Sequence, residues 1–307
     1  MANSHDTEGR DDCRKCTNED CSAKAPRAGE SKEDFHERQA LAERMCRIRH
    51  KIIVLSGKGG VGKSTVAVNL AVALSLSGSK VGLLDVDIHG PSVPQMLRLG
   101  GTRVQVENGS MLPIEIGSLR VMSLGFLLST SDEAVIWRGP MKMSVIKQFL
   151  KDVAWGELDY LVVDCPPGTG DEPLSVVQLI GDMDGAVIVT TPQEVALLAV
   201  RKSVTFCRRL RLPVLGVVEN MSGFACPKCG EVTHIFKAGG GEEMAQAMGV
   251  RFLGRVPISK AVVEATDAGR PCVYHYATDP AAQAFQRIAD GVHSGLEAGQ
   301  TAVAHRD

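Results

Sequence analysis

The stretch that decides the fold is IIVLSGKGGVGKSTVAVNLA, residues 52–71. An apolar run leads into a glycine-rich segment, and a helix-forming run leaves it, which is the context in which backbone N–H groups can point at a phosphate. The pattern G-x-x-x-x-G-K-[ST] falls here: Lys63 can neutralise phosphate charge and Ser64 can supply an oxygen to Mg²⁺. A glycine-rich turn without a ligand is the alternative, which the strand and helix flanks disfavour. The predicted nucleotide site comprises Gly57, Lys58, Gly59, Gly60, Val61, Gly62, Lys63, Ser64 and Thr65.

Apolar runs alternate with helical patterns from residue 51 onward. Several runs are apolar at consecutive positions, as is typical of parallel strands covered on both faces. Right-handed crossovers through the intervening helices then predict an α/β fold, a doubly wound, mostly parallel sheet of the P-loop NTPase type. The Asn-Gly turn within residues 104–126 predicts a hairpin or an edge extension. The expected strands are 52–55, 80–84, 161–163, 186–189 and 214–218, and the expected helices are 64–76, 142–152 and 194–210.

The two ends of the chain differ from its middle. Residues 1–33 are rich in charge and have almost no large apolar side chains, so we expect a mobile tail. Residues 34–50 should form a short helix, over 35–48, and a linker. The ATPase domain is predicted to span 51–296, closing with a helix over 279–296. Residues 297–307 are expected to be a disordered end.

Composition limits the classes of partner. The 307 residues are 44% hydrophobic and carry a formal net charge of −2, which gives no general attraction to nucleic acid or anionic lipid. No apolar run reaches the length of a membrane-spanning helix, and the polar start is unlike a signal peptide. We therefore expect a cytoplasmic protein that acts on neither membrane nor nucleic acid. Its nine cysteines would then serve metal or redox chemistry rather than disulfides.

Carboxylates follow two of the expected strands. Asp164 ends one strand, which is where a water-mediated Mg²⁺ ligand lies beside a phosphate loop. Asp87 begins the loop facing the γ-phosphate and is the candidate that orients or deprotonates the attacking water, with Asp85 as its supporting partner. The alternative is that Asp85 or Asp87 only caps the following turn. The stiff, glycine-hinged residues 166–170 suit a switch that responds to the γ-phosphate.

A Cys-x2-Cys turn lies outside the nucleotide motifs. Cys226 and Cys229 can grip one metal centre through two thiolates. A four-ligand site needs a second pair, and the simplest source is the same pair of a second subunit. CPKCG also resembles half of a zinc ribbon, so structural Zn²⁺ remains an alternative, because thiolates alone do not choose between zinc and iron–sulfur.

The motifs together resemble a known family. The loop KGGVGKST is similar to the deviant phosphate loop of the dimerising class that includes the Min and Par ATPases. With LLDVDIHGPSVPQML, WRGPM, LVVDCPPGTGDEPLS, VVENMSGFACPKCG, FKAGGGEEMA and RVPISKAVVEATDAGRP, in order from about residue 48 to 290, the chain resembles the Mrp/ApbC family of iron–sulfur cluster carrier ATPases.

The resemblance carries specific implications. It implies a homodimer in which Lys58 reaches the phosphates of the partner subunit. It also implies that Asn220 contacts the adenine base, which favours ATP. A [4Fe–4S] cluster bridged by Cys226 and Cys229 of both subunits, and its delivery to apo iron–sulfur proteins, complete the expected function.

Three more cysteines lie in the N-terminal tail. Cys13, Cys16 and Cys21 are the candidates for a second cluster, with Cys46 as one possible fourth ligand. Related eukaryotic scaffold ATPases carry a four-cysteine N-terminal site, and this tail departs from that pattern. A disordered thiol-rich tail or a zinc ligand set are the alternatives.

Two other functions were weighed against the carrier. A Min/Par-like spatial organiser would need a basic amphipathic C-terminal helix for a membrane, or a basic face for DNA. Residues 279–300 hold few basic side chains, which argues against the membrane version. An electron donor like the nitrogenase iron protein would take its bridging cysteines from two separated positions rather than from one Cys-x2-Cys.

Overall fold

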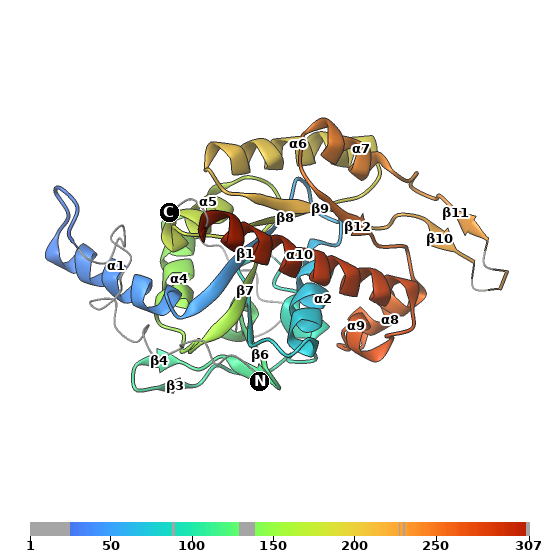
Figure 1. The fold of residues 1–307 in the computed structure, drawn as a ribbon. Helices are drawn as coiled ribbons and strands as arrows, with labels where there is room; N and C mark the ends of the chain where they lie inside the picture. The colour runs from blue at the N-terminus through green and yellow to red at the C-terminus, as the bar shows by residue number, and fades with distance from the viewer. Residues whose placement is uncertain (1–24, 88–89, 129–138, 227, 230, 305–307) are drawn as a thin grey trace, which may run out of the picture.

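The computed structural model describes residues 25–87, 90–128, 139–226, 228–229 and 231–304. An eight-stranded sheet forms its centre, with the strand order β12-β9-β8-β1-β7-β2-β6-β5 (Figure 1). Neighbouring strands are parallel except β5 and β6, which run antiparallel at one edge. The strands are β1 (Ile48–Ser56), β2 (Val81–Asp85), β5 (Ile114–Ile116), β6 (Leu119–Ser123), β7 (Leu158–Asp164), β8 (Gly185–Thr190), β9 (Val214–Glu219) and β12 (Phe252–Arg255). The predicted mostly parallel sheet is confirmed.

The middle strands are buried on both faces, which explains their continuous apolar sequence. In β1 the run from Ile52 to Leu55 is fully buried, and β2 and β8 are buried along their whole length. Helices can cover both faces because each parallel strand is followed by a crossover. The carboxyl ends of the strands, and the loops that follow them, therefore meet along one edge of the sheet.

The helices form the two outer layers. On one face α2 (Lys63–Leu76) packs against α10 (Pro280–Ala304), with α8 (Lys260–Asp267) and α9 (Cys272–His275) beside them. The other face carries α4 (Gly139–Lys151), α5 (Asp171–Ile180), α6 (Glu194–Arg209) and α7 (Gly240–Ala247). The short α3 (Val93–Met96) contacts α2 and α8, and the 3-10 helix η1 (Leu124–Leu127) follows β6. This two-sided winding is the predicted fold class.

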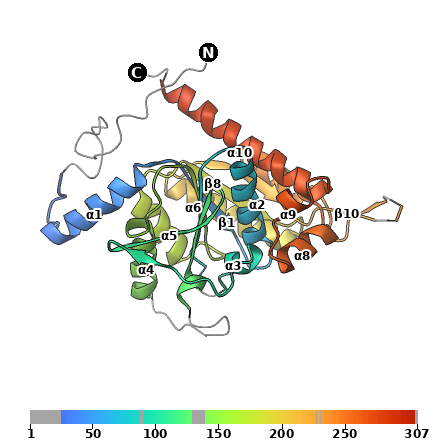
Figure 2. The same ribbon diagram turned by 90° about the horizontal axis from the view of Figure 1, so that it is seen from below.

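Two small hairpins extend the domain. The expected Asn-Gly turn joins β3 (Val106–Glu107) to β4 (Ser110–Met111), with positive φ at Asn108 and Gly109, as such a two-residue turn requires. The second hairpin, β10 (Phe224–Ala225) and β11 (Val232–Thr233), projects away from the body of the protein (Figures 1 and 2). The second hairpin contains the Cys-x2-Cys turn.

The predicted boundaries at both ends need correction. Helix α1 covers Lys32–Met45 rather than 35–48, because Ser31 caps it by accepting a hydrogen bond from the Asp34 N–H, and Ile48 already belongs to β1. At the other end α10 continues to Ala304 and extends beyond the sheet (Figure 2), so the disordered end expected from residue 297 is wrong up to residue 304. Its alanine-rich sequence favours helix. The tail up to residue 24 and residues 305–307 lie outside the described residues.

Candidate functional site

The phosphate loop connects β1 to α2. Gly60 and Gly62 adopt positive φ, and Gly62 is the N-cap of α2 without any side-chain cap. Gly57 lies against α6: a Cβ there would come within 2.3 Å of the Ala199 carbonyl carbon. The N–H groups at the start of α2 are thus left for an anion, as expected of a phosphate site.

A cavity of roughly 240 Å³ opens over this loop. Asp87 and Pro167 border it from the loops after β2 and β7, and Ser92 and Met96 close another side. The cavity brings together the predicted loop, the predicted water-orienting carboxylate and the predicted switch segment. Its lining from the loop comprises Lys58, Gly59, Gly60, Val61, Gly62, Lys63, Ser64 and Thr65.

Lys63 turns toward Asp164 at the bottom of the site. The Lys63 ammonium donates to Asp164 Oδ1 at 2.5 Å, and both side chains are buried. Burial alone would lower the pKa of Lys63, but the charge and the hydrogen bond of Asp164, together with the charge of Asp87, outweigh it and the pKa is raised. Burial also raises the pKa of Asp164, against the opposing effect of Lys63. Asp164 Oδ2 is buried with no hydrogen-bond partner among the described residues, so it fits the role of a carboxylate awaiting a cation or its water.

Asp85 holds the loop that carries Asp87. It accepts hydrogen bonds from Ser123 Oγ (2.9 Å) and from the Asp87 N–H (3.1 Å). Asp85 therefore does cap the turn that follows it, which is the alternative role that the sequence offers. Asp85 also lies beside Asp164 in the register of β2 and β7. Burial, and then the charge of Asp164, raise the pKa of Asp85 to about 7. Two neighbouring buried carboxylates thus share the one positive charge of Lys63.

The predicted switch segment, residues 166–170, is anchored at its middle residue. The Gly168 N–H donates to the Ser56 carbonyl at 2.8 Å, which ties the segment to the end of β1. Gly168 has a φ of 96°, a conformation that favours glycine. Helix α5 begins directly after the segment at Asp171.

Asn220 contacts the phosphate loop from the end of β9. Its side chain donates to the Val61 carbonyl at 2.9 Å, and its N–H donates to the Thr190 carbonyl at 2.8 Å. A Cβ at Gly62 would lie 2.2 Å from Asn220 Nδ2, so a side chain cannot replace this glycine.

The Cys-x2-Cys pair lies at the tip of the β10–β11 hairpin. The Cys226 N–H donates to the Glu231 carbonyl at 2.9 Å, which closes the turn. Cys226 is half-buried and Cys229 is exposed. The pKa of the Cys226 thiol is lowered, first by the Cys229 N–H and then by the Lys228 N–H. Within the described ranges no group of three or more histidine, cysteine or acidic side chains could hold a metal ion, so the pair offers two ligands on its own.

Comparison with known proteins decides the family. The family model described as NUBPL iron-transfer P-loop NTPase, of the ParA type, matches residues 47–293. The chain belongs to this family. Membership confirms the predicted resemblance to iron–sulfur cluster carrier ATPases.

Curated relatives carry matching names. An iron–sulfur cluster carrier protein of Methanocaldococcus jannaschii is 53% identical over 234 residues, which are 76% of this chain and 81% of the relative. The cytosolic Fe-S cluster assembly factor NUBP2 of Bos taurus is 49% identical over 268 residues, 85% of this chain and 99% of the relative.

Solved structures agree with the fold. A nucleotide-binding protein from Archaeoglobus fulgidus, solved in complex with ADP, has a TM-score of 0.68 and 42% identity over 76% of this chain and 91% of its own. The septum site-determining protein MinD of Pyrococcus horikoshii, complexed with Mg-ADP, has a TM-score of 0.60 at 22% identity, covering 79% of this chain and 95% of its own. The MinD likeness shows the fold alone.

The remaining cysteines of this NUBPL-family chain fall into three groups. Cys165, Cys207 and Cys272 are buried, as predicted for small apolar side chains, and burial raises their thiol pKa values. Cys46 is half-buried at the end of α1. Cys13, Cys16 and Cys21 lie outside the described residues.

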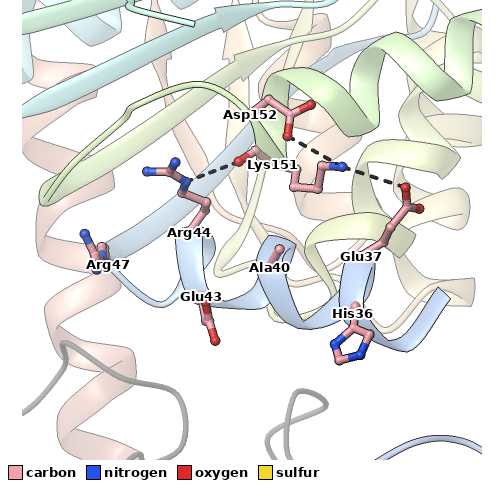
Figure 3. A pocket seen from close by; sticks show the side chains of 8 residues that line it. All are labelled: His36, Glu37, Ala40, Glu43, Arg44, Arg47, Lys151 and Asp152. Carbon is pink, nitrogen blue, oxygen red and sulfur yellow. Dashed lines mark hydrogen bonds and ion pairs between the residues drawn. The ribbon is translucent and has the colours of Figure 1, made fainter. Parts of the chain in front are cut away.

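A larger cavity, roughly 600 Å³, lies between α1 and the end of α4 (Figure 3). Lys151 Nζ lies 3.5 Å from Asp152 Oδ1 and 3.8 Å from Glu37 Oε1, and Arg44 Nε donates to the Lys151 carbonyl. The contacts of Lys151 with Glu37 and Arg44 fasten α1 to α4 at the amino ends of β1 and β7, the edge opposite the phosphate loop. We assign the cavity to packing of α1 rather than to the nucleotide site.

Several residues of the site were missed from sequence. Ser92 and Met96 border the cavity, and Glu219 binds the backbone at the start of α7. Ser92 and Met96 stand in the motif GPSVPQM, whose turn composition was a usable signal. Glu219 follows an apolar strand run as any surface carboxylate would, so no local pattern distinguishes it.

Proposed function

We propose that this protein binds and hydrolyses ATP and carries an iron–sulfur cluster on Cys226 and Cys229, which it delivers to apo iron–sulfur proteins in the cytoplasm. The observation that carries the proposal is the pairing of two sites in one domain. A phosphate loop lies at one strand end, and an exposed cysteine hairpin begins directly after the strand end that contacts it. The names of the relatives support a carrier, and the ADP complex of the Archaeoglobus protein supports a nucleotide.

The nucleotide chemistry follows from the buried charges. We infer that ATP draws the Lys63 ammonium from Asp164 to its β- and γ-phosphates, because a phosphate offers more negative charge. Asp164 Oδ2 and the Ser64 hydroxyl would then hold Mg²⁺, with Asp164 acting through water. Bound Mg²⁺ supplies charge neutralisation to the phosphates. Asn220 is proposed to meet the adenine base.

Asp87 is proposed to orient the attacking water. It borders the cavity over the loop, and Asp85 fixes its backbone by accepting the Asp87 N–H. A carboxylate in this place can accept a proton from water as the γ-phosphate leaves. The Pro167 segment, tied to β1 through Gly168, borders the same cavity and would respond to that departure.

The cysteine pair calls for a partner. Two thiolates complete half of a Cys₄ site, and the β10–β11 hairpin that carries them projects from the body of the protein (Figure 1). A homodimer with a [4Fe–4S] cluster on four thiolates satisfies the ligand count. The Lys58 ammonium has no ion-pair partner within the described part of the chain, which suits a role on the phosphates of the partner.

A transfer assay tests the proposal. The full chain is loaded anaerobically with iron and sulfide and mixed with an apo enzyme that needs a [4Fe–4S] cluster, and recovery of that enzyme's activity is followed. We expect recovery with wild-type protein and with Cys207→Ala, a buried cysteine away from the hairpin, and none with Cys226→Ser/Cys229→Ser. Equal recovery with the double variant would reject the hairpin as the carrying site. Zinc without iron in the anaerobic protein would favour a structural metal.

A further inference from the structure

Glu219 is a buried carboxylate that the proposed chemistry does not use. It is the last residue of β9, it is fully buried, and it directly precedes Asn220. A buried charge is costly unless hydrogen bonds satisfy it. The groups that donate hydrogen bonds to Glu219 therefore show which segments of the chain its carboxylate holds in place.

The donors come from the two segments that connect the cysteine hairpin to the domain, which we call its outgoing and returning roots. On the outgoing side, Ser222 Oγ donates to Oε1 at 2.5 Å. On the returning side, the Gly239 N–H donates to Oε1 at 3.0 Å and the Gly241 N–H to Oε2 at 2.5 Å. Arg255 Nε lies 3.5 Å from Oε1. One carboxylate thus joins the chain as it leaves for the hairpin and as it comes back.

The glycines at the start of α7 are explained by this contact. Helix α7 has no cap from its own N-cap residue, Gly239, and Glu219 supplies both the acceptor and the negative charge that a helix start favours. A Cβ at Gly241 would lie 2.9 Å from Glu219 Oε2, so the strand end and the helix approach more closely than a side chain allows.

The same strand end touches the nucleotide loop. Asn220 donates to the Val61 carbonyl at 2.9 Å, one residue after Glu219. On the outgoing root, the Ser222 N–H also donates to the carbonyl of Val256, the residue after β12, at 2.9 Å. A shift of the phosphate loop would therefore move Asn220, and with it the adjacent Glu219, whose carboxylate holds the hairpin.

We propose that Glu219 is a positioning residue that couples the phosphate loop to Cys226 and Cys229 by holding both roots of their hairpin to the Asn220 strand end. This inference rests on the proposed function, in which nucleotide and cysteine pair act together. Glu219→Gln keeps the shape but replaces one acceptor oxygen with an NH₂ group, so one of the backbone or hydroxyl donors loses its acceptor.

The readout is thiol alkylation in the full-length, metal-free protein. Iodoacetamide labelling of the peptide containing Cys226 and Cys229 is measured by mass spectrometry with and without Mg-ATP. For wild type we expect the labelling rate to change by about fivefold or more on ATP binding, the lower range of typical coupling between sites. Glu219→Gln should bind ATP within about twofold of wild type and lose most of that change, since the link and not the site is removed.

Two further variants make the result decisive. Glu243→Gln is the matched control, an exposed acid in the first turn of the same helix, and should keep the full ATP response. Ser222→Ala removes one donor and leaves the carboxylate, so its response should be reduced, and it decides the question if Glu219→Gln does not fold. If Glu219→Gln responds to ATP as strongly as wild type, the role of Glu219 is overturned and the proposed function is not. If Glu219→Gln does not fold, the same result with Ser222→Ala overturns that role. Wild-type labelling that ignores ATP would overturn this role together with the proposed coupling.

Discussion

Lys63 and Lys58 differ in burial, and we expect their replacement to differ in effect. Lys63 is buried against Asp164, whereas Lys58 is half-buried beside the cavity. Lys63→Ala should abolish productive ATP binding, because it removes the cation that meets the phosphates and leaves two buried carboxylates unpaired. Lys58→Ala should slow hydrolysis more than it weakens binding, if Lys58 acts on the partner's phosphates. Nucleotide titration and turnover of both variants check this, and equal loss of affinity would contradict the trans role.

Asp85 should make the nucleotide-free protein less stable as the pH rises. Its pKa is about 7 in the folded protein against 3.8 ordinarily, so between these values the folded state holds one more proton than the unfolded state. The free energy of unfolding then falls with pH across that window, by at most about 1.4 kcal/mol per pH unit from this group. Asp85→Asn resembles the protonated form and should flatten the slope.

Urea unfolding between pH 5 and pH 7.5 measures the difference in slope between wild type and Asp85→Asn. The slope contribution of Asp85 should fade as the pH falls through 3.8, where the unfolded state takes up the same proton. Parallel stability curves for the two proteins across the window would contradict the assigned protonation of Asp85.

At the scale of elements, the packing of α6 on the phosphate loop can be tested through a glycine. Gly57→Ala places a Cβ 2.3 Å from the Ala199 carbonyl carbon, which forces the helix away from the loop. We expect a loss of about 1–3 kcal/mol in unfolding free energy and weaker ATP binding. Gly59→Ala in the same loop meets only Pro167 Cγ at 3.9 Å and should be nearly neutral in stability. Chemical denaturation of both variants checks the contrast, and a similar loss in both would argue against close packing at Gly57.

The N-terminal segment offers a second test at this scale. Helix α1 starts at Lys32 and is fastened to α4, on the side of the molecule away from the cysteine hairpin (Figures 1 and 2). Removing residues 1–24 leaves α1 and its cap intact. If Cys13, Cys16 and Cys21 hold a cluster, the truncated protein should carry less iron per dimer and keep its ATPase activity. Unchanged iron after identical anaerobic purification would leave the tail as a thiol-rich extension.

At the scale of the whole molecule, local patterns predicted the parallel sheet and the phosphate loop because their signals are contiguous in sequence. The apolar run 52–55 and the loop after it needed no distant information. The contact of Lys63 with Asp164 could not be predicted, since it joins residues far apart in the chain through the register of the sheet. The role of Glu219 could not be predicted for the same reason, because the Gly241 N–H that donates to it lies beyond the hairpin in the sequence. The end of α10 was misplaced because its polar, alanine-rich sequence has no apolar pattern to mark its length.

No helix within the described ranges is both long enough and apolar enough to cross a membrane. In the proposed dimer, two copies share one cluster through their hairpins. Each chain would then bring half of the ligands, so cluster binding and dimerisation should be linked. Loss of the cysteine pair should therefore weaken the dimer as well as remove metal.

The most direct measurement is native mass spectrometry of the anaerobically purified full chain, comparing wild type with Cys226→Ser/Cys229→Ser. Comparing the two cancels any metal held by the N-terminal tail. We expect wild-type dimers to exceed the variant by about four iron and four sulfide per two chains, as one shared [4Fe–4S] cluster requires. The same iron and sulfide in the variant, or zinc in place of iron in wild type, would contradict this expectation.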